Sequence, residues 1–443
     1  MSKKPPGPHG LQTIPHTLDF IREQIPYIQR MAREYGDVVR FRLGNLDNLL
    51  VSDPAIIHEV LVSKAQDFHK DEITHDLKEL LGEGLLTAEG DQWKRNRKLA
   101  SPNLQRTQVS VYADIMSQLS TDAVGRWKHG EERDLHQDMM HLTMEIVVKT
   151  LFNLDSGPEL DEVSHHVDVA MHYFHLMTHT PWRWVPEVFP MPARKDFKHS
   201  IERLDEVVYG LIEKRRGGEE GHDLLWRLIQ AKDDEGEGMD DKQLRDEVIT
   251  MFLAGHETTA LVATYTWFLL VQHRDVLDKV FEEVDRVLQK RQAGFDDLQS
   301  LSYLNAVIKE SMRLYPPAWI IGRQAIRDTT LGDYEVKKGM QILISQMVLH
   351  RKPDVFENPD EFRPQRWLEP GFEKSLPRHA YLPFGGGARI CIGNHFAMME
   401  AILIVASMAQ HIDFELRMTT DMQVSPAVTM RPVVPVTVRV HRR

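Results

Sequence analysis

One long apolar helix limits the folds open to this chain more than any other feature. The predicted helix begins at Asp240, a typical N-cap residue with Gln243 three residues later as an imperfect capping box, and extends to about His273. It spans 34 residues (240–273), or roughly 50 Å at 1.5 Å per residue. Because its middle reads VITMFLAG and then ALVATYTWFLLV, we expect it to cross the interior of the protein.

The rest of the chain reads as mainly helical with a minor β part. No internal repeat and no convincing linker divides it, so we expect a single domain over residues 1–443, although length alone would allow roughly three. The predicted elements outside the long helix are a hairpin over 37–53, helices with breaks at 81–90, 153–158, 180–192 and 233–238, a helix over 301–315, strands over 334–336 and 341–345, a loop over 350–393, a helix over 395–412 and a β-type tail over 433–440.

Composition excludes several classes of protein. Hydrophobic residues make up 42% and charged residues 27%, which is typical of a globular chain. The net charge of −12 argues against general nucleic-acid binding. Mean hydropathy is −0.38, and no run of about 18 apolar residues occurs, so we expect no transmembrane span. The N-terminus, MSKKPPGPHG, lacks the apolar stretch of a secretory signal, and we expect a soluble, cytoplasmic protein.

The single cysteine, Cys391, lies in the glycine-rich segment FGGGARICIG at 384–393. One cysteine excludes a disulfide framework, a Cys-rich zinc site and a CxxC redox pair within the chain. A nucleotide P-loop is excluded as well, because Ile390 breaks the glycine pattern and no Lys-Ser/Thr follows. Nearby backbone N–H groups and a following helix stabilise a thiolate, which could bind a metal. Arg389 suits a neighbouring carboxylate, such as an acid group of a cofactor.

A polar segment, His256-Glu257-Thr258-Thr259, interrupts the long apolar helix. A zinc protease would place a second histidine at position 260, where this chain has Ala260. Gly255 beside the Thr258 hydroxyl allows the helix to open locally, and an acid beside an alcohol can hold water and pass protons. The alternative is a pair of satisfied hydroxyls with a glutamate that reaches water.

Together these segments resemble the cytochrome P-450 family. The family loop FxxGxRxCxG matches at every fixed position. These positions are Phe384, Gly387, Arg389, Cys391 and Gly393. Three further family motifs occur in the family's order. The WxxxR motif is Trp93 and Arg97, and the oxygen-activation segment AGHETT at 254–259 contains Glu257 and Thr258. The ExxR pair is Glu310 and Arg313, with Arg366 as its expected third partner. The chain is therefore identified as a member of this family, of the soluble bacterial type.

The resemblance implies the cytochrome P-450 fold, with a long central helix over haem b (iron protoporphyrin IX) and small β-sheets in the N- and C-terminal parts. Cys391 is then the proximal iron ligand. Thr258 and Glu257 would deliver protons to bound oxygen. His256 is expected to pack or to touch substrate. The residues expected on the haem propionates are Trp93, Arg97, Arg323 and Arg389. Those expected to form a buried network under the cysteine loop are Glu310, Arg313 and Arg366.

The resemblance also implies a substrate pocket and an electron donor. Family topology places the walls of the pocket at 68–86, 167–188, 250–258, 318–321 and 424–430. The apolar residues that these segments carry include Met171, Phe174, Met177, Trp182, Trp184, Leu253, Trp319, Ile320 and Val428. Such a wall suits a fatty acid, terpenoid, steroid or carotenoid. Only 50 residues follow Gly393 (443 − 393), so no reductase is fused there and a separate ferredoxin or flavodoxin with its reductase is expected. Its docking surface would include the basic cluster of Lys94, Arg95, Arg97, Lys98 and Arg106; a solvated helix face is the alternative.

The leading hypothesis is a monooxygenase that inserts one oxygen atom from O2 into a C–H bond or a double bond. A peroxide-driven or rearranging haem-thiolate enzyme is the first alternative, and a non-catalytic haem carrier or sensor is the second. The intact Glu257-Thr258 pair favours the monooxygenase over both.

Overall fold

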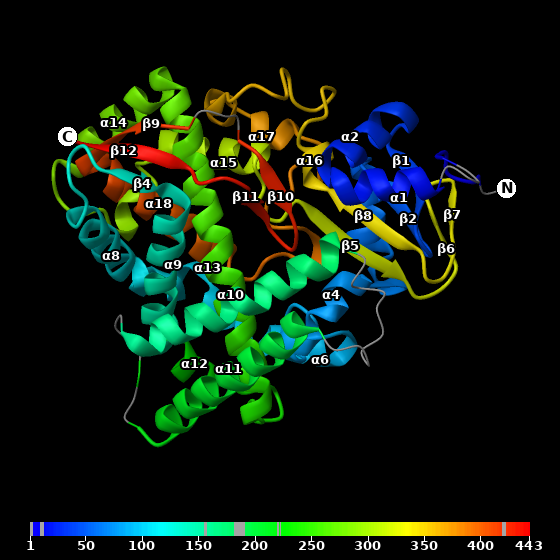
Figure 1. Cartoon of the computed structure of the whole chain (residues 1–443), viewed down its shortest axis with the longest axis horizontal. Helices are drawn as coiled ribbons and strands as arrows, with labels where there is room; N and C mark the ends of the chain where they lie inside the picture. The colour runs from blue at the N-terminus through cyan, green and yellow to red at the C-terminus, as the bar shows by residue number, and fades with distance from the viewer. Residues whose placement is uncertain are drawn as a thin grey trace.

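The computed structural model describes residues 3–8, 13–154, 157–180, 191–218, 221, 223–418 and 422–443. Helices fill most of the molecule, and the largest sheet lies at one side of it (Figure 1). The predicted class, mainly α with a minor β part, is confirmed. Among the described residues, none of the helices combines the length and the apolar character that a bilayer crossing requires.

The α-helices are α1 (Thr13–Arg22), α2 (Gln24–Tyr35), α3 (Pro54–His58), α4 (Glu72–Asp76), α5 (Lys78–Leu81), α6 (Gly90–Ala100), α7 (Arg106–Val109), α8 (Ala113–Gly125), α9 (Leu135–Phe152), α10 (Pro158–His179), α11 (Pro192–Arg216), α12 (Leu224–Gln230), α13 (Asp241–Gln272), α14 (Arg274–Leu288), α15 (Ser302–Leu314), α16 (Gln346–Leu349), α17 (Phe372–Ser375) and α18 (Asn394–His411). The strands are β1 (Val38–Leu43), β2 (Leu46–Val51), β3 (Phe68–His69), β4 (Glu132–Asp134), β5 (Ile320–Ala325), β6 (Thr329–Leu331), β7 (Tyr334–Val336), β8 (Gln341–Ser345), β9 (Ile412–Leu416), β10 (Val424–Pro426), β11 (Met430–Pro432) and β12 (Thr437–Arg442).

The central helix α13 confirms the long apolar prediction. The Asp240 carboxylate caps it by accepting a hydrogen bond from the Gln243 N–H at 2.7 Å. Helices α9, α11, α15 and α18 pack against it, and Trp267 and Tyr265 are fully buried on it. In Figure 1 it passes through the middle of the helical part. A helix surrounded on all sides buries apolar residues around its whole circumference.

The largest sheet has the strand order β1-β2-β8-β5-β3. The predicted hairpin is its outer pair, with Val38 opposite Val51 and Leu43 opposite Leu46. Strands β7 and β8 also lie where the sequence predicts them. Strand β5 was not predicted, yet it pairs antiparallel with β8. Of the predicted break at 180–192, residues 181–190 lie outside the described residues.

The C-terminal tail makes two separate contacts. Strand β12 begins at Thr437, later than predicted, and pairs with β9 and β4. Before it, the hairpin of β10 and β11 lies on the central helix, where the Tyr265 hydroxyl donates to the Met430 carbonyl at 2.5 Å. This contact brings residues 428–431 to the polar segment of α13.

Candidate active site

A cavity of about 440 Å³ lies between α13 and the cysteine loop. Cys391 lines one side of it, and Ala254, Glu257 and Thr258 of the central helix line the other. The fold therefore brings together the two segments that the sequence singled out, although 133 positions (391 − 258) separate Cys391 from Thr258.

The cysteine loop is shaped by a backbone that only glycine adopts readily. Gly387 has φ of +67°, and a Cβ there would lie 2.0 Å from the carbonyl oxygen of Leu61. The Cys391 N–H closes the loop by donating to the Phe384 carbonyl at 2.8 Å. Arg97 Nη1 donates to the Ile390 carbonyl at 2.8 Å, which ties α6 to the same loop.

Cys391 is an exposed residue, and it lines the cavity between the loop and α13. Burial raises the pKa of this thiol, while the Gly393 backbone N–H and the Arg97 guanidinium act in the opposite direction. Since burial prevails, the protein alone does not stabilise the thiolate fully. A bound metal cation would supply the missing stabilisation, because a coordinated thiol is deprotonated.

Cationic side chains gather at one edge of the cavity. The four residues predicted for the haem propionates all line the cavity; they are Trp93, Arg97, Arg323 and Arg389. The Arg389 guanidinium lies 4.2 Å from the centroid of the Trp93 ring, and its Nη1 donates to the Ala88 carbonyl at 2.8 Å. Burial and the charge of Arg389 lower the pKa of Arg323 to about 10. Mutual repulsion at this edge would be relieved by a bound dianion.

Lys70 belongs to this cationic edge and was not predicted. It lines the cavity, and burial together with Arg323 and Arg389 lowers its pKa to about 7. Lys70 lies in 68–86, a segment expected to border the cavity, and this position was the only sequence signal for its role. A lone lysine in FHKDE matches no motif. A pocket that holds Cys391 together with these four cations, Lys70, Arg97, Arg323 and Arg389, fits a haem with its two propionates.

Thr258 makes the predicted bond from its hydroxyl to a backbone carbonyl. Its hydroxyl donates to the Ala254 carbonyl at 2.6 Å, the back-bonded arrangement that slightly loosens a helix. The helix nevertheless continues without a break through this segment, so the predicted local opening is absent. Gly255 instead lets α9 approach, since a Cβ there would lie 3.1 Å from a methyl carbon of Val147.

Glu257 is buried, with 2% of its surface exposed, and it lines the cavity. Its carboxylate accepts hydrogen bonds from the Thr429 hydroxyl and from Arg431 Nε. Burial raises the pKa of Glu257, but Arg431 and Thr429 outweigh burial and hold the pKa below its ordinary value. Sequence reasoning missed Arg431, which directly follows the segment expected to form a pocket wall.

His256 points away from the cavity. Its Nε2 lies 3.0 Å from the Met140 carbonyl oxygen, and burial lowers its pKa to about 4. The packing role predicted for it therefore agrees with the structure, and the substrate contact does not.

The predicted network behind the cysteine loop is assembled and buried. Glu310 and Arg313 are 0% exposed and Arg366 is 2% exposed. Arg313 binds the Glu310 carboxylate through two N–H groups at 2.8 and 2.9 Å, and Arg366 Nε donates to it at 3.1 Å. The Trp367 indole N–H adds a fourth bond at 2.8 Å. The carboxylate thus joins α15 to the loop that precedes the cysteine.

The predicted pocket wall is correct in part. Met171, Leu253, Ile320 and Val428 line the cavity. Phe174, Met177 and Trp319 do not: Phe174 packs on Phe197, Met177 packs against the helical core, and the Trp319 indole N–H donates to the Ala427 carbonyl at 3.0 Å. Further apolar residues of the wall include Leu77, Leu81, Leu85, Leu86, Met251 and Ile321. Trp182 and Trp184 lie outside the described residues.

The predicted basic docking cluster on α6 is largely paired within the chain. Lys98 pairs with Asp234, and Arg95 binds Asp233 at 2.9 Å. Lys94 binds Asp91 at 2.8 Å. The acidic loop at 233–238 therefore neutralises much of the charge that the sequence suggested for a partner.

Known proteins resemble this chain over nearly its whole length. The sequence model of the family described as Cytochrome P450 matches residues 5–437. The cyclooctat-9-en-7-ol 5-monooxygenase of Streptomyces melanosporofaciens is 33% identical over 91% of this chain and 88% of its own. The pentalenene oxygenase of Streptomyces avermitilis is 30% identical over 99% of this chain and 95% of its own. The crystal structure of the cytochrome P450DA haem domain covers all of this chain and 98% of its own, at 25% identity and a TM-score of 0.90.

Proposed function

The chain belongs to the cytochrome P450 family, and from that premise we propose that it uses O2 and two electrons to hydroxylate or epoxidise a terpenoid. Its general class, a cytochrome P450 monooxygenase of lipophilic small molecules, follows from the family and its relatives. The observation that carries the proposal is the apolar cavity that Cys391 and Thr258 share. The two relatives named for cyclooctat-9-en-7-ol and pentalenene support a terpenoid.

The cofactor is a haem, and we propose haem b. Cys391 would hold the iron, and the residues that would hold the propionates are Lys70, Trp93, Arg97, Arg323 and Arg389. When bound, this group supplies an iron centre that activates O2, with electron donation from the thiolate favouring O–O cleavage.

The chain's own residues would control protons and water. The Thr258 hydroxyl, back-bonded to Ala254, lies on the cavity where it can hold a water molecule. Glu257 beside it carries the proton-accepting carboxylate, which Arg431 keeps ionised. The leucine and methionine side chains of the wall would exclude other water, which would suppress side reactions.

Electrons would reach the haem from a separate protein. We propose a ferredoxin or flavodoxin with its reductase as the donor. Because Arg95 and Lys98 are engaged by the 233–238 loop, an acidic donor would have to compete with that loop for the α6 surface.

Ligand titration of the ferric protein tests the substrate class. A saturable low-to-high-spin shift with terpenoids, and not with fatty acids or steroids, is expected. Leu253→Phe should weaken this binding because Leu253 lines the cavity, whereas the control Phe174→Leu should not. Equal effects of the two variants would contradict the assigned pocket.

Isotope labelling tests the reaction. With 18O2 and a reconstituted electron donor, the product should contain one labelled oxygen atom. Product formed only with added peroxide and without label would favour the peroxide-driven alternative. Binding without any product would favour a carrier or sensor.

A further inference from the structure

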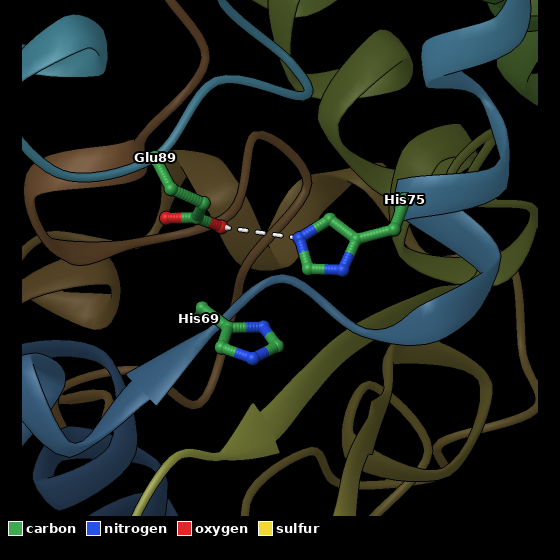
Figure 2. A group of neighbouring side chains, drawn as sticks. All are labelled: His69, His75 and Glu89. Carbon is green, nitrogen blue, oxygen red and sulfur yellow. Dashed lines mark ion pairs between the residues drawn. The ribbon is translucent and has the colours of Figure 1, made fainter.

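A second cluster of ligand-type side chains lies beside the cationic edge of the haem cavity, but outside the cavity lining. It consists of His69 at the end of β3, His75 on α4, and Glu89 directly before α6. Figure 2 shows the two imidazole rings and the carboxylate turned toward one shared space. One donor atom from each residue lies within 4.8 Å of the other two, and all three residues are partly exposed. An ion and its water ligands can therefore reach them.

The spacing suits an ion better than a direct hydrogen bond. His75 Nε2 lies 3.9 Å from Glu89 Oε1, beyond hydrogen-bond distance. Two donors bound tetrahedrally to zinc at about 2.0–2.1 Å lie about 3.4 Å apart. Closing the difference requires only a small rotation of side chains that are each 29% exposed. Two imidazoles and a carboxylate are also a donor set that zinc prefers.

The Lys70 main chain positions two of the three ligands. Its N–H donates to Glu89 Oε1 at 2.7 Å, and its carbonyl oxygen lies 2.5 Å from His69 Nδ1. Arg389 also pairs with the Glu89 carboxylate. Such outer contacts orient metal ligands and are part of the usual construction of a metal site.

Arg323, Arg389 and Lys70 would repel a metal cation unless their charge is neutralised. In the proposed function these cations face the two propionates of the haem, so the neutralising charge is present in the loaded enzyme. The cluster must therefore be tested in the haem-containing protein.

We propose that His69, His75 and Glu89 bind a zinc ion, with water completing a tetrahedral set. The ion would join the two ends of the segment 69–89. The residues between the ligands include Leu77, Leu81, Leu85 and Leu86, which form one wall of the cavity. Fixing both ends of this segment lowers its conformational freedom, so zinc would stiffen the wall and slow the exchange of substrate.

Calorimetric titration of the haem-loaded, chelator-treated protein with zinc chloride tests the assignment. The wild type should bind one zinc ion, and His69→Ala or His75→Ala should weaken binding at least tenfold. The matched control is His141→Ala, because His141 Nδ1 lies 3.6 Å from Glu145 in a similar His–carboxylate pair elsewhere. Unchanged haem absorbance of the variants verifies their fold.

Hydrogen exchange of the wild type locates the ion without any variant. Zinc should slow amide exchange within 69–89, and this protection should disappear in His75→Ala. Equal zinc affinity of the wild type and His75→Ala, absence of zinc binding by the wild type, or protection confined to other segments would each overturn the proposal.

Discussion

Replacing Arg431 with glutamine should make the stability of the protein depend on pH in a way that identifies its role. Arg431 is the cation that holds the Glu257 carboxylate, which is 2% exposed. Removing one partner of a buried ion pair typically costs about 3–5 kcal/mol. Because the Arg431 side chain is 32% exposed, we expect a smaller penalty, about 2–3 kcal/mol at pH 8.

Two other buried acids of this chain show in which direction the pKa of Glu257 should shift when Arg431 is removed. Glu247 and Glu400 are buried, and among the described residues no cation pairs with either carboxylate; burial raises the pKa of each to about 8. In the wild type the pKa of Glu257 lies below its ordinary value. Without Arg431, burial would dominate and raise the pKa of Glu257 above that value.

The sign of the pH effect is then opposite in the two proteins. In the wild type, the stability from Glu257 is present above its unfolded pKa of about 4.3 and is lost as pH falls through the lower folded pKa. In Arg431→Gln, its contribution is present below about pH 4.3 and is lost as pH rises through the raised folded pKa. The penalty should therefore grow from pH 5 to pH 8.

Urea unfolding of the ferric protein at pH 5 and pH 8, followed by circular dichroism, measures this penalty. Asp168, His136 and His256 respond to the charges of both Glu257 and Arg431, so the contribution of Glu257 is read from the single and double variants, which both lack Arg431. The double variant Glu257→Gln/Arg431→Gln leaves no charge at positions 257 and 431 and should recover stability at pH 8. An equal penalty at both pH values, or a double variant no more stable than the single one, would refute the reasoning.

Three further outcomes are expected. Cys391→Ser should abolish the thiolate-specific absorbance of the carbon monoxide complex, and a retained signal would exclude Cys391 as the ligand. Thr258→Ala should lower the yield of product per O2 consumed while the substrate-induced spin shift persists, and unchanged coupling would contradict its proton role. Glu310→Gln should destabilise the protein by about 3 kcal/mol or more, since Arg313 and Arg366 would stay buried without their anion; denaturant titration checks this value.

The sequence by itself determined the features that local patterns encode. Periodicity and capping specified the central helix almost to the residue, because helix formation depends on neighbours three and four positions apart. Glycines and Cys391 at fixed spacing specified the haem loop, since Gly387 must adopt a backbone that other residues avoid. The resemblance to cytochrome P-450, stated on these motifs, is confirmed by the family match.

Only the tertiary structure decided which distant residues meet. Glu257 and Arg431 are 174 positions apart, and their pairing depends on the C-terminal hairpin lying on the central helix. Lys70 joins the cationic edge only because the strand before it packs beside β5. Leu253 faces the cavity and Phe174 does not, since the packing of each helix selects the side that it presents. Sequence periodicity shows that a residue is apolar and buried, whereas the neighbouring elements determine whether it meets core or ligand.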